Sequence, residues 1–222
     1  MDWTALGISL ALAACTLVIL LPLGIAAGRQ LAFTRSRAKP WFEALAALPL
    51  VLPPTVIGYY LLVTLGAQSP LGEAFTRLFG APLAFSFSGL VVASVLVNVP
   101  FMLQPVQRGF AAIGDEVREA AQCCGLSRWQ ALWRIEMPLA WPGVLAGAVL
   151  TFAHTLGEFG VVLMVGGSIP GATRTIAISI YDRVQALDTA AAGTMALTLL
   201  AISFATVALA YGVSERLLAR NR

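Results

Sequence analysis

The segment Glu119–Pro138, EAAQCCGLSRWQALWRIEMP, is the longest polar interval between two strongly apolar regions of the chain. It predicts two short helices that meet at Gly125, because glycine tolerates the positive φ that commonly ends a helix. Asp115 is expected to cap the first helix by accepting from the free N–H groups of its first turn. Ser127 and Gln130 have the spacing of a capping box for the second helix.

Further signals mark the two ends of this interval. At its far end, Pro138 cannot donate to a helical hydrogen-bond ladder and is expected to break or kink the chain. Four residues at the near end fall on one helix face with i, i+3, i+4, i+7 spacing, namely Val117, Ala120, Ala121 and Cys124. The interval is therefore expected to form an amphipathic helix–turn–helix.

The composition of the chain around this interval indicates a membrane protein. Of its 222 residues, 59% are hydrophobic and only 11% are charged, whereas a soluble domain carries about 25% charged residues. The length predicts one domain, residues 1–222. A net charge of +3 is compatible with a nucleic-acid partner or anionic lipid, but the positions of the charges explain it better as membrane topology.

A membrane span needs about 20 predominantly apolar residues, and five stretches of the chain meet this requirement. They are residues 3–28, 44–66, 85–105, 139–165 and 189–213. Residues 67–84 form a mixed loop, residues 169–188 are amphipathic, and residues 106–138 form the polar loop that holds the helix pair. The predicted fold class is therefore all-α, a polytopic membrane protein with five transmembrane helices.

The basic residues decide the orientation, because cytoplasmic loops carry an excess of Lys and Arg. With the N-terminus outside and the C-terminus in the cytoplasm, the cytoplasmic side holds Arg29, Arg35, Arg37, Lys39, Arg108, Arg118, Arg128, Arg134, Arg216, Arg220 and Arg222. The external side then holds Arg77, Arg174 and Arg183. Eleven residues against three favour this arrangement and place the polar interval in the cytoplasm.

The polar interval also carries a motif. Its spacing resembles the EAA loop of ABC-importer permeases at six positions: Glu119, Ala120, Ala121, Gly125, Ile135 and Pro138. Met137 departs from the leucine that the family commonly has before the proline. The resemblance implies that these six residues couple the chain to a separate cytoplasmic ATPase subunit, which binds ATP and Mg²⁺. The alternative is a helical hairpin that only connects two spans.

The family resemblance implies further partners, and the sequence agrees that ATP hydrolysis resides in a separate subunit. Lys39, the one lysine, lies between Ala38 and Pro40 and not in the glycine–lysine–Ser/Thr loop that cradles phosphates. We therefore expect neither ATP hydrolysis nor a cofactor in this chain, and no enzymatic activity. The resemblance implies a periplasmic or extracellular substrate-binding protein and, because such a chain is half a pore, a second subunit. We expect a homodimer, with a related permease chain as the alternative.

Small residues in the spans allow the close helix approach on which contacts in lipid depend. Gly143, Gly147 and Ala148 are examples in the fourth predicted span.

Two ionisable residues lie within the fourth predicted span. His154 precedes Glu158 by one helical turn, so the two side chains share a face. A metal site needs one or two more ligands, and none is predicted. Glu158 follows Leu139 by nineteen residues, about 28 Å along a helix, which places it near the outer interface. It is either hydrogen-bonded structure at the pore mouth or part of a gate with Gly157 and Gly160 as hinges.

Two further stretches resemble molybdate permeases, with sulfate and tungstate permeases as the alternatives. They are Leu52–Gly58, with the sequence LPPTVIG, and Gly157–Gly160 followed by Thr173–Thr175. Pro53 and Pro54 force a helix break, and freed backbone groups at membrane depth are tolerated only inside protein or beside water.

These breaks suggest candidates for the pore and for external contacts. Pro53, Pro54 and Thr55 are expected at the pore, or else the prolines form a kink that aids packing. Arg174 and Arg183 are candidates for meeting the binding protein or steering the anion.

Two hypotheses from other classes remain. A membrane-embedded enzyme would use His154 and Glu158, but it requires polar residues from several spans to converge. A scaffold that recruits a cytoplasmic partner through the polar interval has no use for proline and glycine interruptions inside spans. Both are weaker than transport across the cytoplasmic (inner) membrane.

Overall fold

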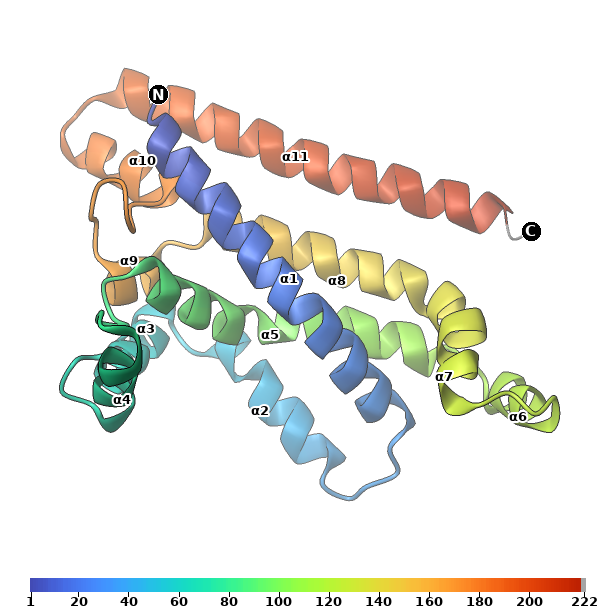
Figure 1. Ribbon diagram of the computed structural model, residues 1–222. Coiled ribbons are helices and arrows are strands. Elements are labelled where there is room, and N and C mark those ends of the chain that lie inside the picture. The colour runs from blue at the N-terminus through green and yellow to red at the C-terminus, as the bar shows by residue number, and fades with distance from the viewer. Residues whose placement is uncertain (221–222) are drawn as a thin grey trace.

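The computed structural model describes residues 1–220, with side-chain surroundings up to residue 209, and this part of the chain is built from helices (Figure 1). The side chains of Arg216 and Arg220 and the whole of Arg222, which enter the orientation argument, lie outside it. The longest helices are α1 (Trp3–Phe33), α5 (Phe87–Ala111), α8 (Met137–Gly157) and α11 (Thr189–Arg220). The predicted all-α, polytopic fold class is confirmed.

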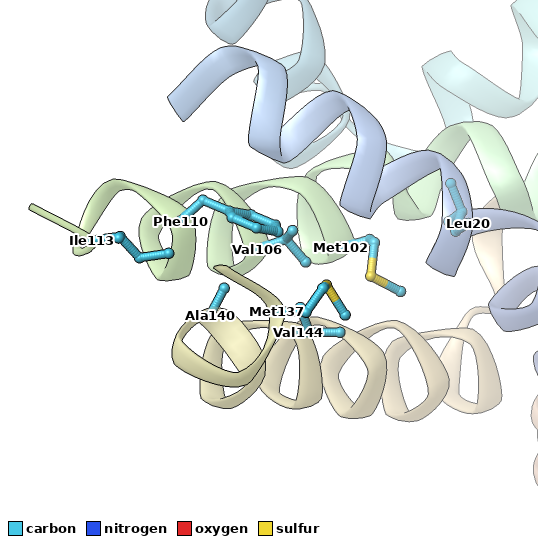
Figure 2. Close-up of a cluster of buried hydrophobic side chains, with 8 residues drawn as sticks. All are labelled: Leu20, Met102, Val106, Phe110, Ile113, Met137, Ala140 and Val144. Carbon is cyan, nitrogen blue, oxygen red and sulfur yellow. The ribbon is translucent and has the colours of Figure 1, made fainter. Parts of the chain in front are cut away.

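Helix α5 lies at the centre and packs against both α1 and α8. Figure 2 shows the side chains that fill the space between these helices: Leu20, Met102, Val106, Phe110, Ile113, Met137, Ala140 and Val144. The backbones approach closely at glycines. A Cβ atom on Gly143 would lie 2.5 Å from the carbonyl oxygen of Pro105, and one on Gly147 2.9 Å from that of Met102. These glycines therefore join two spans of the same chain, which is the packing that small residues permit in lipid.

Two of the predicted spans are broken. The second consists of α2 (Lys39–Val51) and α3 (Pro54–Leu65), which meet at an angle of 108°. Pro53 and Pro54 have no N–H to continue the helix, so the predicted break lies where expected. Within the described residues, four helical segments are long and apolar enough to cross a membrane, or five if this bent pair is one span.

The fourth predicted span is also discontinuous. Helix α8 ends at Gly157, the backbone is extended at Glu158, and the short helix α9 (Gly160–Gly166) follows. The stretch 139–165 is therefore a long helix and a short helix joined at Glu158 and Phe159, which we call the elbow.

The loops at the end of the bundle away from the polar interval contain two helices (Figure 1). Residues 67–84 were expected to be a mixed loop, but they contain α4 (Pro70–Phe79). Its start is fixed by the Ser69 hydroxyl, which accepts from the Gly72 N–H at 2.9 Å, and its end by Gly80 at φ 72°. The amphipathic stretch 169–188 contains α10 (Ile176–Gln185).

The polar interval folds as α6 (Asp115–Cys123), a turn, α7 (Arg128–Ala131) and the π-helix η1 (Leu132–Glu136), which we call the hairpin. Gly125 has φ 74°, as its place after the first helix predicts. The capping box of Ser127 and Gln130 is also present, with bonds of 3.2 and 2.9 Å.

One prediction about the hairpin is wrong, and of the break or kink expected at its far end the break is absent. Asp115 does not cap α6: it is the first helical residue, Gly114 occupies the cap position, and the Asp115 carboxylate accepts from Arg118 at 3.4 Å instead. Pro138 does not break the chain, since α7, η1 and α8 form one continuous segment. The reason is the π turn: the Met137 N–H donates to the Leu132 carbonyl, five residues back, and this shift of register lets the helix pass a residue without a donor.

Candidate functional site

Five of the six motif residues lie in the hairpin, at one end of the molecule (Figure 1), and the sixth, Pro138, directly follows it in α8. Glu119 and Ala120 are exposed on α6, whereas Ala121 is 4% exposed and faces the bundle. Gly125 forms the turn, Ile135 is half-buried in η1, and Pro138 is exposed in the first turn of α8. Of the predicted apolar face of α6, only Ala121 is buried, so Val117, Ala120 and Cys124 remain available to another molecule.

The base of the hairpin is tied to α1 by a buried ion pair that sequence reasoning missed. Glu136 is 3% exposed, and its carboxylate accepts from the Arg29 guanidinium through both oxygens: Nη2 lies 3.0 Å from Oε1, and Nε bonds to Oε2. Such paired N–H···O bonds are geometrically specific. Glu136 lies next to the motif residue Ile135, and Arg29 is the first charge after the first span, but a sequence separation of 107 hides the pairing.

A cleft of about 850 Å³ separates the end of α1 from the hairpin. Phe33, Arg118, Leu126 and Trp129 are among the residues that line it. The Arg118 guanidinium carbon lies 3.7 Å from the centroid of the Phe33 ring, which is within the range of a cation–π contact. The hairpin therefore contacts α1 through a few charged groups and remains accessible around them.

The two broken spans meet at the opposite end of the bundle, where α3 packs against α9. A Cβ atom on Gly160 would lie 2.8 Å from the Cβ of Pro54, and one on Gly58 would lie 2.7 Å from the Cβ of Met164. Glycine is thus what permits this approach. A Cβ on Gly157 would meet nothing within 4 Å, so Gly157 adjoins the contact without taking part in it.

The structure thus brings some of the gate candidates into contact. Pro54 and Gly160 touch, and Pro53 and Thr55 flank Pro54 as exposed residues. Glu158 is 7% exposed, and its Oε1 accepts from the Val161 N–H at 2.9 Å. Its carboxylate therefore caps the start of α9 in the manner of an N-cap side chain.

The external candidates Arg174 and Arg183 both have carboxylate partners. The Arg174 Nε lies 2.9 Å from the Ser168 hydroxyl and 3.6 Å from the Asp182 carboxylate. Arg183 lies 3.3 Å from Asp188. Each positive charge is balanced locally, so neither arginine presents an isolated cation to an anion in solution.

Proteins of similar sequence are membrane transport components. Residues 5–219 match the family described as "Binding-protein-dependent transport system inner membrane component". The chain is 47% identical over 203 residues to the molybdenum transport system permease protein ModB of Azotobacter vinelandii, covering 91% of this chain and 90% of that protein. It is 33% identical over 161 residues to the sulfate transport system permease protein CysT of Escherichia coli (strain K12), covering 72% of this chain and 58% of that protein.

A solved structure has a similar fold. It is the crystal structure of a bacterial alginate ABC transporter in complex with an alginate pentasaccharide-bound periplasmic protein. The TM-score is 0.77 over 96% of this chain and 78% of that chain, at 17% sequence identity. At this identity the likeness concerns the fold alone.

Proposed function

The chain belongs to the family of binding-protein-dependent transport system inner membrane components, and we propose that it is the permease subunit of an ATP-driven molybdate importer. The observation that carries the proposal is the 47% identity, over nearly the whole of both chains, to a molybdenum transport permease. The chain is a multi-pass protein of the inner membrane. Membership of a transport family favours this role over a membrane-embedded enzyme or a scaffold.

In this proposal the hairpin is the contact with a separate ATPase subunit, which binds ATP and Mg²⁺. Support comes from the exposure of Glu119 and Ala120 on α6 and of the neighbouring Val117 and Cys124. A docking surface needs such accessible side chains on a rigid element, and the turn at Gly125 together with the ion pair at Glu136 supplies the rigidity. A second copy of this chain would complete the pore.

The cargo is proposed to be selected mainly outside this chain, by a binding protein on the outer side. None of the five predicted spans contains a Lys or Arg, and Arg29, which directly follows the first span, is bound by Glu136. A pore wall without a free cation at mid-depth offers little charge-based discrimination between oxyanions. Pro53, Pro54 and Thr55, together with Gly157, Glu158 and Gly160, are proposed to line or gate this path.

Sulfate and tungstate are the alternative cargoes. The sulfate permease relative, at 33% identity over 72% of this chain, favours sulfate as the second candidate. Both alternatives keep the same mechanism and the same partners, because the differences concern only the anion.

Uptake by the complete transporter tests the cargo. The chain, its ATPase and its binding protein would be reconstituted in vesicles, and radioactive molybdate uptake would be measured against excess tungstate or sulfate. We expect ATP-dependent molybdate uptake that sulfate inhibits weakly. Sulfate uptake without molybdate uptake would replace the proposed cargo, and no ATP-dependent uptake of any oxyanion would reject the transport role.

The orientation has its own test. With the N-terminus outside, a topology reporter fused at Arg37 or Arg128 should report the cytoplasm, and one at Arg77 or Asp182 the outer side. An external signal at Arg128 would place the hairpin out of reach of an ATPase and would reject the proposed contact.

A further inference from the structure

Polar side chains form a continuous row through the apolar centre of the bundle, far from the hairpin. The row begins at Thr16 on α1, whose hydroxyl donates to the Ser94 hydroxyl on α5 at 2.9 Å. It continues through Asn98 on α5 to His154 on α8 and ends at Glu158 in the elbow. Thr16, Ser94 and Asn98 are at most 1% exposed. Buried polar groups cost free energy unless they are hydrogen-bonded, and here they are bonded to one another.

The hydrogen bonds of Asn98 determine which nitrogen of the His154 ring carries a proton. Asn98 Nδ2 lies 2.8 Å from the Ser94 carbonyl oxygen, and because a carbonyl can only accept, this atom must be the amide nitrogen. The Asn98 oxygen therefore faces Nδ1 of His154, at 3.0 Å, and Nδ1 must carry the proton. The ring also stacks on Phe101, with centroids 3.9 Å apart. One edge and one face of the imidazole are thus held by α5.

The other edge of the ring faces the elbow. His154 Nε2 lies 3.7 Å from Glu158 Oε2, while Oε1 of the same carboxylate accepts from the Val161 N–H. The two carboxylate oxygens therefore have separate partners: one starts α9, and the other faces the fixed ring. With the proton on Nδ1, Nε2 presents a lone pair to the carboxylate. At 3.7 Å the two groups can be joined through one bridging water that donates to both, and not by a direct hydrogen bond.

We propose that Asn98 is a positioning residue, which acts through His154 to set the Glu158 carboxylate and thereby the direction in which α9 leaves α8. The direction matters because α9 rests on α3 at the Gly160–Pro54 contact, where the two broken spans meet. A change of elbow angle would separate or press together these two helices. The consequence for transport rests on the proposed function, whereas the effect on the elbow does not.

Hydrogen–deuterium exchange in the complete transporter, held in lipid nanodiscs, tests the effect on the elbow. In Asn98→Leu, which keeps the branched skeleton of the side chain but replaces the amide oxygen and nitrogen with methyl groups, we expect amide exchange in residues 161–166 to rise about tenfold. Exchange in the centres of α1 and α5 should stay unchanged, and molybdate uptake should fall by a similar factor. The matched control is Thr151→Val on α8, since Thr151 is fully buried and its hydroxyl has no partner.

Two further variants separate positioning from packing. His154→Phe keeps a ring against Phe101 but has no polar edge, so it should behave like Asn98→Leu. His154→Gln has an amide N–H that can reach a carboxylate one turn away, so it should recover part of the protection of α9. A role in packing alone predicts the reverse order.

The outcomes are distinct. The proposal is overturned if Asn98→Leu and His154→Phe exchange like Thr151→Val in residues 161–166, or if exchange rises equally throughout the bundle. If exchange rises locally while even the parent transporter imports no oxyanion, the positioning role stands and the proposed function fails.

Discussion

The hairpin and the elbow are attached to the same bundle by different chemistry. The hairpin touches α1 through charged groups, with Arg29 bound to Glu136 and Arg118 over Phe33, beside an open cleft. The elbow is held by the Val161–Glu158 and Asn98–His154 hydrogen bonds and by the close contact of Gly160 with the Pro54 ring. A unit on a few strong contacts can move as one body, whereas a closely packed joint changes only if its side chains rearrange. The hairpin can thus move as a unit, whereas the angle of the elbow can change only if its packed side chains rearrange.

The largest expected effect concerns the ion pair at the base of the hairpin. In Glu136→Ala, Arg29 loses its partner, and breaking a buried pair costs about 3–5 kcal/mol. We expect the lower end of this range, because 29% of the Arg29 side chain is exposed. Thermal unfolding in detergent measures the loss.

The double variant Arg29→Met/Glu136→Leu controls for the unpaired charge. It should regain most of the stability, because removing both charges leaves neither one buried alone. Equal losses in the single and double variants would contradict the view that a specific charged contact holds the hairpin.

The next effect tests the packed elbow. Gly160→Val places side-chain atoms where Pro54 lies, 2.8 Å from the new Cβ, and overpacking of this kind costs about 1–3 kcal/mol. Uptake should fall strongly while the amount in the membrane is maintained. Gly7→Val on α1 is the matched control, because Gly7 is exposed and nothing lies within 4 Å of its new Cβ. Equal uptake by the two variants would show that the contact between the broken spans is dispensable.

The third effect tests the turn at Gly125, between the two helices of the hairpin. Gly125 has φ 74°, and a left-handed conformation costs other residues roughly 1–2 kcal/mol. Gly125→Val should therefore reorient α6, weaken co-purification of the ATPase and abolish transport, with normal amounts of the chain in the membrane. Gly114→Ala is the control, since its φ is −60° and its surroundings are open. Full coupling of ATP hydrolysis to uptake in Gly125→Val would make the hairpin a mere linker.

The hairpin and the broken spans also differ in how much of their structure can be predicted from the sequence. The turn at Gly125, the capping box and the break at Pro53–Pro54 follow from chemistry within a few residues, so they could be predicted. The continuation of the helix through Pro138 could not, because it depends on the π turn at Leu132–Glu136, which has no sequence signature of its own.

The contacts across the bundle lie beyond such local signals. Arg29 and Glu136 are 107 residues apart, and Asn98 and His154 are 56 apart. Their pairing depends on how α1, α5 and α8 pack, which no local pattern specifies. The sequence thus predicted the hairpin and the break at Pro53–Pro54, and it suggested Gly157 and Gly160 as hinges, but it predicted neither the break at Glu158 nor the side chains that secure these features.

The smallest expected effect lies on the exposed face of α6 and probes the hairpin as a docking surface. Glu119→Lys reverses a charge on an exposed side chain, so it should leave the fold intact and weaken ATPase binding only through long-range electrostatics. Such interactions are screened over about 10 Å at 0.1 M salt and about 3 Å at 1 M.

Co-purification of the ATPase with Glu119→Lys should therefore be reduced a few-fold at low salt and approach that of the parent as salt rises, if the parent interface is itself salt-tolerant. The control is Glu116→Lys, the same charge reversal at another exposed position of the same helix, outside the motif. If the carboxylate of Glu119 faces the partner, only its reversal should produce a salt-dependent defect. Equal defects in both variants would show that only the net charge of α6 matters. A defect that persists at high salt would show that Glu119 contacts the ATPase directly and does not act by long-range attraction.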